Sequence, residues 1–190
     1  MPINWPNLLT WLRILLIPLV IGVFYVPDDW LTLQGRNSTA AGLFVAAALT
    51  DWLDGYLARR LNQTSAFGAF LDPVADKLVV AAALIMLVSL GRVGAVVAMV
   101  IIGREITISA LREWMAKLGK GAGVAVNFLG KIKTAFQLVA IPLLLFDGQI
   151  GGQHSRPVGV VLIYVAAGLT LVSMGYYLRQ SAVDRRQSSG

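Results

Sequence analysis

The chain has 190 residues, of which 57% are apolar and only 14% are charged. Soluble domains carry about 25% charged residues, and a water-soluble globule of this size could not bury so much apolar surface. The absence of cysteine excludes a disulfide-stapled secreted domain. The net charge is +6, but the basic residues form no compact run, so we predict no nucleic-acid binding. The composition therefore indicates an integral membrane protein.

Six apolar stretches are long enough to cross a bilayer as helices, which takes about 20 residues each. They cover residues 8–25, 39–60, 67–90, 93–116, 124–146 and 158–177. Residues 1–7 include Trp5 and predict a short N-terminal segment at the membrane interface, where tryptophan is enriched. The sequence thus predicts an all-α membrane protein with six transmembrane helices. A single domain spans residues 1–180, and a polar cytoplasmic tail covers residues 181–190.

Basic residues in the connections predict the orientation, because lysine and arginine are retained on the cytoplasmic side of a membrane. Seven lie in the second-to-third connection, the fourth-to-fifth connection and the tail: Arg59, Arg60, Lys117, Lys120, Arg179, Arg185 and Arg186. The opposite side has three: Arg36, Arg92 and Arg156. We therefore expect both termini in the cytoplasm.

Four aspartates lie within the predicted second and third helices, where ionisable side chains are costly and usually functional. Asp51 and Asp54 are three residues apart, and Asp72 and Asp76 are four apart, so each pair shares a helix face. At 1.5 Å per residue, both pairs lie at matching depth near the cytoplasmic side. This arrangement implies a polar cavity open to the cytoplasm. Converging carboxylates need cations to neutralise them, and hard oxygen ligands suit two Mg²⁺ or Mn²⁺ ions.

Other interpretations explain less. Structural ion pairs would account for Glu105 and Glu113 beside Arg104 and Arg112, but not for the aspartates. A cation transporter or channel predicts carboxylates spread through the membrane depth and repeated halves of the chain. A structural or assembly membrane protein leaves the aspartate spacing without explanation.

The aspartates belong to a longer pattern, with eight specified residues over 26 positions: Asp51, Asp54, Gly55, Ala58, Arg59, Gly68, Asp72 and Asp76. This pattern resembles the defining motif of the CDP-alcohol phosphatidyltransferases. Softer matches at residues 6–13, 104–114 and 130–134 extend the resemblance over nearly the whole chain. They resemble the bacterial branch of the family that uses sn-glycerol 3-phosphate.

The resemblance implies an enzyme of the bacterial cytoplasmic membrane, and a homodimer. It would transfer the phosphatidyl group from CDP-diacylglycerol to sn-glycerol 3-phosphate and release CMP. By the same resemblance, Asp51, Asp54, Asp72 and Asp76 hold two divalent ions, and Asp76 is also the general base. The residues expected to contact CDP-diacylglycerol are Asn7, Thr10, Arg13, Gly55, Arg59, Ser65 and Gly68.

A further group of polar residues is expected to bind the acceptor: Arg104, Arg112, Lys131, Lys133 and Thr134. Two or three cations would hold a phosphate dianion well, which favours a phosphorylated acceptor over serine or a neutral polyol. The alternative is that these cations snorkel or pair with the nearby glutamates. Other acceptors within the family, namely phosphatidylglycerol, inositol phosphate or serine, remain the rival interpretation.

Overall fold

The computed structural model describes the backbone of residues 5–61, 66–117 and 128–187. Side chains are described for residues 8–53, 71–111, 113–114, 130 and 132–175. The helices in these ranges are α1 Trp5–Gly22, α2 Leu33–Leu61, α3 Ala66–Ser89, α4 Ala95–Lys117, α5 Phe128–Phe146 and α6 Ser155–Gln187. A 3-10 turn, η1 Val23–Tyr25, follows α1, and the short strands β1 Gln149–Ile150 and β2 Gln153–His154 pair as a hairpin before α6. The predicted all-α architecture is confirmed over the described residues.

The two ends of the helical chain differ from the prediction. The first helix already begins at Trp5, so residues 5–7 form its first turn rather than a separate interfacial segment; residues 1–4 lie outside the described part. The last helix continues to Gln187, and residues 181–187 of the predicted tail are therefore helical. No glycine or proline interrupts residues 176–187, which allows the helix to continue beyond its apolar stretch.

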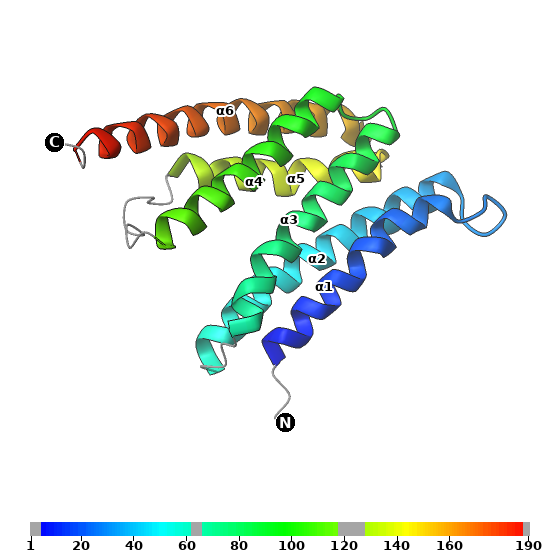
Figure 1. The fold of residues 1–190 in the computed structure, drawn as a ribbon. Helices are drawn as coiled ribbons and strands as arrows, with labels where there is room; N and C mark the ends of the chain where they lie inside the picture. The colour runs from blue at the N-terminus through cyan, green and yellow to red at the C-terminus, as the bar shows by residue number, and fades with distance from the viewer. Residues whose placement is uncertain (1–4, 62–65, 118–127, 188–190) are drawn as a thin grey trace.

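The helices form two groups (Figure 1). In the first group α1 packs against both α2 and α3; in the second, α6 packs against α5 and α4. Contacts of α2 with α5 and of α3 with both α4 and α5 join the groups. The starts of α1, α3 and α5 and the ends of α2, α4 and α6 lie at one end of the molecule, termed here the terminal end. The opposite end, where α5 turns into α6, is termed the hairpin end.

Every helix contributes to the apolar core. Fully buried members include Phe44 of α2, Leu87 of α3, Ile101 of α4, Ile141 of α5 and Ile163 of α6. Small residues allow close approach where helices cross. At Gly159 of α6, a Cβ atom would lie 2.7 Å from Cγ of Leu144 on α5, so this crossing requires glycine.

The first helix shows how the surface is arranged. Many of its large apolar side chains point outward, whereas its polar Thr10 and Arg13 are buried; the exposed apolar residues are Leu8, Trp11, Leu12, Leu15 and Leu19. An apolar exterior with polar groups in the interior suits a lipid environment. Within the described residues, two helical segments are long and apolar enough to cross a membrane, Leu8–Tyr25 and Ser155–Gly175.

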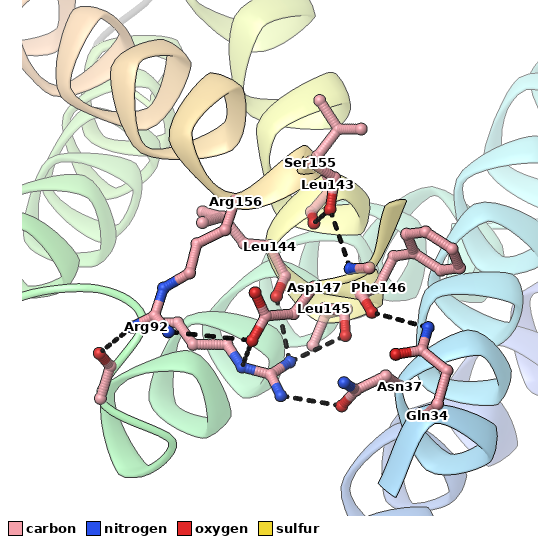
Figure 2. Close-up of polar contacts among 12 residues, drawn as sticks. Gln34, Asn37, Arg92, Leu143, Leu144, Leu145, Phe146, Asp147, Ser155 and Arg156 are labelled. Carbon is pink, nitrogen blue, oxygen red and sulfur yellow. Dashed lines mark hydrogen bonds and ion pairs between the residues drawn. The ribbon is translucent and has the colours of Figure 1, made fainter. Parts of the chain in front are cut away.

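A buried arginine closes the hairpin end (Figure 2). Arg92, in the α3–α4 connection, donates to the carbonyl oxygens of Leu144 and Leu145 at 3.1 and 2.8 Å. These carbonyls belong to the last turn of α5 and have no acceptor role within the helix. The guanidinium also donates to Asn37 Oδ1 on α2 at 2.8 Å and lies 3.1 Å from Asp147 Oδ2. Arg92, assigned from the sequence to an outer connection, is therefore a buried link between α2, α5 and the loop after α5.

The loop after α5 needs this support. Asp147 has a φ of 41°, a left-handed conformation that non-glycine residues rarely adopt. Its carboxylate contacts Arg92 and, at 3.9 Å, Arg156, while Arg156 also donates to the carbonyl of Gly91 at 2.9 Å. Ser155 Oγ donates to the Leu143 carbonyl at 3.0 Å. Polar contacts therefore hold the strained turn in place.

Candidate active site

One face of α1 holds carboxylates from two other helices at the terminal end. Arg13 is 1% exposed, and its Nη1 lies 2.8 Å from Oδ1 of Asp51 on α2. Thr10, three residues earlier on the same helix face, is also buried and donates its hydroxyl to Oδ1 of Asp72 on α3. One member of each predicted aspartate pair, Asp51 on α2 and Asp72 on α3, is thus held by α1.

Asp76 lies one turn after Asp72 and is exposed. Its carboxylate is within electrostatic range of Asp51 on α2, Arg13 on α1 and Glu105 on α4, as well as of the neighbouring Lys77. Charged groups from four helices therefore act at this carboxylate. Of the charged residues predicted to converge, Asp51, Arg13, Glu105 and Lys77 act together on Asp76.

The carboxylates fit divalent ions by their chemistry. All the anionic donors are carboxylate oxygens, the hard ligands that Mg²⁺ and Mn²⁺ prefer, and like charges on Asp51 and Asp76 favour a neutralising cation. Among the described residues, no three His, Cys, Asp or Glu side chains gather as a metal-binding group. Asp54, the remaining predicted ligand, lies outside the described side chains. We therefore treat metal binding by these aspartates as a proposal.

The residues predicted to bind the acceptor are distributed over two helices, α4 and α5. Lys133 of α5 is 1% exposed and forms an ion pair with Glu105 of α4. Arg104 of α4 is buried; its Nη2 donates to Ser173 Oγ on α6 at 3.3 Å, and its Nε has no hydrogen-bond partner. Thr134 is exposed and donates to the Gly130 carbonyl at 2.9 Å. The pairing of Glu105 with the adjacent Arg104, considered from the sequence, is wrong because neighbouring helix residues point about 100° apart.

The other residues assigned to the site from the sequence lie outside the described side chains. They are Asn7, Asp54, Gly55, Arg59, Ser65, Gly68, Arg112 and Lys131.

A cavity of about 730 Å³ lies between α3 and α4. Its apolar lining comes mainly from Val74, Leu78 and Ile106, and its polar lining from Lys77 and Glu105, together with Ser109 and Glu113. The sequence predicted a polar cavity, but neither its place between α3 and α4 nor the position of Glu105 between it and Lys133. The only sequence signal was the depth of Glu105 within a predicted transmembrane helix.

A layer of carboxylates and buried cations at one end of a helical membrane-type fold is suited to handling phosphate groups. Residues 3–172 match the family model for CDP-alcohol phosphatidyltransferases, and the chain belongs to this family. The family is membrane-embedded. The resemblance inferred from the aspartate motif is thereby confirmed.

More specific similarity comes from individual relatives. The chain is similar to the CDP-diacylglycerol–glycerol-3-phosphate 3-phosphatidyltransferases of Shigella flexneri serotype 5b (strain 8401) and Escherichia coli (strain K12). Each is 48% identical over 186 residues, which cover 97% of this chain and 98% of the relative.

Proposed function

We propose that this protein transfers the phosphatidyl group of CDP-diacylglycerol to sn-glycerol 3-phosphate, yielding phosphatidylglycerophosphate and CMP. The observation that carries the proposal is the 48% identity over nearly the full length of relatives named for this reaction. The carboxylates and buried cations at the terminal end supply groups that the reaction needs.

We infer that six helices cross the bacterial cytoplasmic membrane, with the terminal end and both termini in the cytoplasm. The exposed apolar residues of α1 support contact with lipid. A membrane site also suits a substrate whose two acyl chains stay in lipid while its head group and the acceptor are polar. The homodimer implied by the resemblance stays a prediction.

In the proposed reaction, a hydroxyl oxygen of the acceptor attacks the phosphorus that is esterified to diacylglycerol. A new P–O bond forms, the P–O bond to CMP breaks, and CMP leaves with the bonding electrons. Asp76 accepts the hydroxyl proton as general base. Divalent ions, when bound by Asp51, Asp54, Asp72 and Asp76, neutralise charge on the phosphoryl oxygens.

Thr10 and Arg13 have a second role in this scheme. We assign them to the CDP-diacylglycerol site with Asn7, Gly55, Arg59, Ser65 and Gly68. Their contacts with Asp72 and Asp51 support a positioning role as well, since each holds one carboxylate oxygen before substrate binds. Fixed carboxylates lower the cost of assembling the reactive geometry.

The acceptor phosphate would be held by Arg104, Arg112, Lys131 and Lys133, with Thr134 nearby. Burial of Lys133 and Arg104 supports this assignment, because buried cations bind phosphate more strongly than solvated ones.

The test is to incubate purified protein with CDP-diacylglycerol and a panel of alcohols, then identify the lipid product by mass spectrometry. The panel contains glycerol 3-phosphate, glycerol, inositol phosphate, serine and phosphatidylglycerol. We expect phosphatidylglycerophosphate as the main product and glycerol as a very poor acceptor. Comparable reaction with serine or inositol phosphate would move the protein to another branch of the family. Absence of CMP release with every alcohol would favour a cation transporter instead.

A further inference from the structure

The ion pair between Lys133 and Glu105 connects a fully buried side chain to a partly open one. Lys133 is 1% exposed, whereas Glu105 is 23% exposed and lines the cavity between α3 and α4. A buried ammonium requires an anionic partner, because an uncompensated buried charge is strongly destabilising. Glu105 meets this requirement, and Glu105 itself also lines the cavity.

Glu105 has another cation within reach of the same cavity. Lys77 of α3 lines it together with Glu105. A Glu105 carboxylate that left Lys133 would therefore enter a space lined by polar groups as well as apolar ones, namely Lys77, Ser109 and Glu113. This makes separation of the pair less costly than for an ion pair closed on all sides.

A second buried cation precedes this pair on α4. Arg104 hydrogen-bonds to the neutral hydroxyl of Ser173, and its Nε has no hydrogen-bond partner. Asp76 on α3 adds a carboxylate within electrostatic range of Glu105. Arg104 therefore offers a buried donor to an anion that enters here, whereas the carboxylates of Glu105 and Asp76 oppose it.

We propose that Glu105 occupies, in the free protein, the place on Lys133 that the phosphate of the acceptor takes on binding. This rests on the proposed function, because a phosphorylated acceptor drives the exchange. The phosphate displaces the carboxylate from the ammonium, and Glu105 turns toward the cavity and Lys77. When the product leaves, Glu105 returns to Lys133. An alcohol without phosphate cannot drive this exchange, so Glu105 contributes to acceptor specificity.

The substitution Glu105→Gln tests the exchange, since glutamine keeps the shape of the side chain and removes the competing charge. The acceptor KM should fall roughly tenfold, near the lower limit for one charge-assisted hydrogen bond. The inhibition constant of inorganic phosphate should fall by a similar factor. The KM for CDP-diacylglycerol should stay within twofold, and kcat should not rise, because product phosphate is held more tightly.

Two variants make the result specific. Glu113→Gln removes the same charge from the same helix and cavity, eight residues further along, and should leave the acceptor KM and phosphate inhibition unchanged. Lys133→Met should raise the acceptor KM roughly 10- to 150-fold. In the Lys133→Met background, Glu105→Gln should have no further effect on the acceptor KM, since the coupling between the two residues is gone.

The outcomes separate this proposal from the proposed function. If the unaltered protein makes no phosphatidylglycerophosphate, the proposed function fails. If it does, but Glu105→Gln leaves the acceptor KM and phosphate inhibition unchanged or weakens both, the exchange is wrong. In that case the pair serves only to hold α4 to α5, and a lower thermal stability without tighter phosphate binding would be its signature.

Discussion

Two buried arginines at opposite ends of the molecule have different surroundings. The guanidinium of Arg92, at the hairpin end, donates hydrogen bonds to two helix carbonyls and an amide oxygen. It also forms an ion pair with the carboxylate of Asp147, whose side chain is only 22% exposed. Arg13, at the terminal end, pairs with Asp51, whose carboxylate is 47% exposed. The first arrangement is closed to ligands, whereas the second leaves an anionic partner accessible. We therefore expect the residues around Arg92 to stabilise the fold, and the accessible Asp51 carboxylate is consistent with the metal-binding role that we propose for it.

Removing divalent metal should affect the terminal end, with its exposed carboxylates, far more than the closed hairpin end. If the exposed carboxylates of the terminal end hold catalytic ions, a chelator should abolish CMP release completely, and added Mg²⁺ or Mn²⁺ should restore it. The Arg92 cluster has no part in metal binding, so the apparent melting temperature should change much less than the activity. Full activity in excess chelator would contradict the two-metal proposal.

Replacing the proposed base should separate catalysis from binding. Asp76→Asn preserves the size of the side chain but cannot accept the hydroxyl proton. Loss of a general base costs about 10²- to 10⁴-fold in rate. We expect kcat to fall by this amount while nucleotide affinity, measured by CMP inhibition, stays within a few-fold. Equal losses of CMP affinity in Asp76→Asn and Asp51→Asn would instead show that Asp76 acts mainly as a ligand.

At the hairpin end the expected effect is on stability. Arg92→Met leaves Asp147 and the carbonyls of Leu144 and Leu145 without their partner, which should cost about 3–5 kcal/mol. Thermal denaturation in detergent should show a lower apparent melting temperature, with kcat and both KM values unchanged for the protein that remains folded. Arg156→Met is the matched control. Arg156 is 47% exposed and lies 3.9 Å from Asp147, so its loss should cost about 1 kcal/mol or less. A loss of kcat in Arg92→Met at low temperature, where the variant is folded, would contradict a purely structural role of Arg92.

The sequence predicted the helices well where apolar residues dominate. It predicted them less well where contacts between helices determine where a helix begins. The second helix begins at Leu33, six residues before the predicted start at residue 39. The added residues are mostly polar and gave no apolar signal. They are held by tertiary contacts, since Gln34 donates to the Phe146 carbonyl at 3.4 Å and Asn37 accepts from Arg92. Such contacts join residues more than 50 positions apart, and no local pattern contains them.

The candidate site shows the same limit. Spacing alone placed Asp51, Asp72 and Asp76 in one layer, because helix geometry fixes which residues share a face. It could not show that Thr10 holds Asp72 or that Arg13 holds Asp51, since these pairs depend on how α1 packs against its neighbours. The partner of Glu105 was also decided by packing, because Lys133 reaches it from a different helix.

The buried Arg13 also bears on the order in which the chain assembles. Because α1 precedes α2 in the chain, Arg13 enters the bilayer before Asp51 is available to pair with it. An arginine costs about 2.5–3.5 kcal/mol at the centre of an inserting helix, and Arg13, the sixth residue of the segment Leu8–Tyr25, costs less than this. Each leucine returns about 0.3–0.6 kcal/mol. The leucines that surround Arg13 in α1 therefore do more than contact lipid in the finished protein. They offset the temporary cost of a lone charge until the second helix arrives and Asp51 can pair with it.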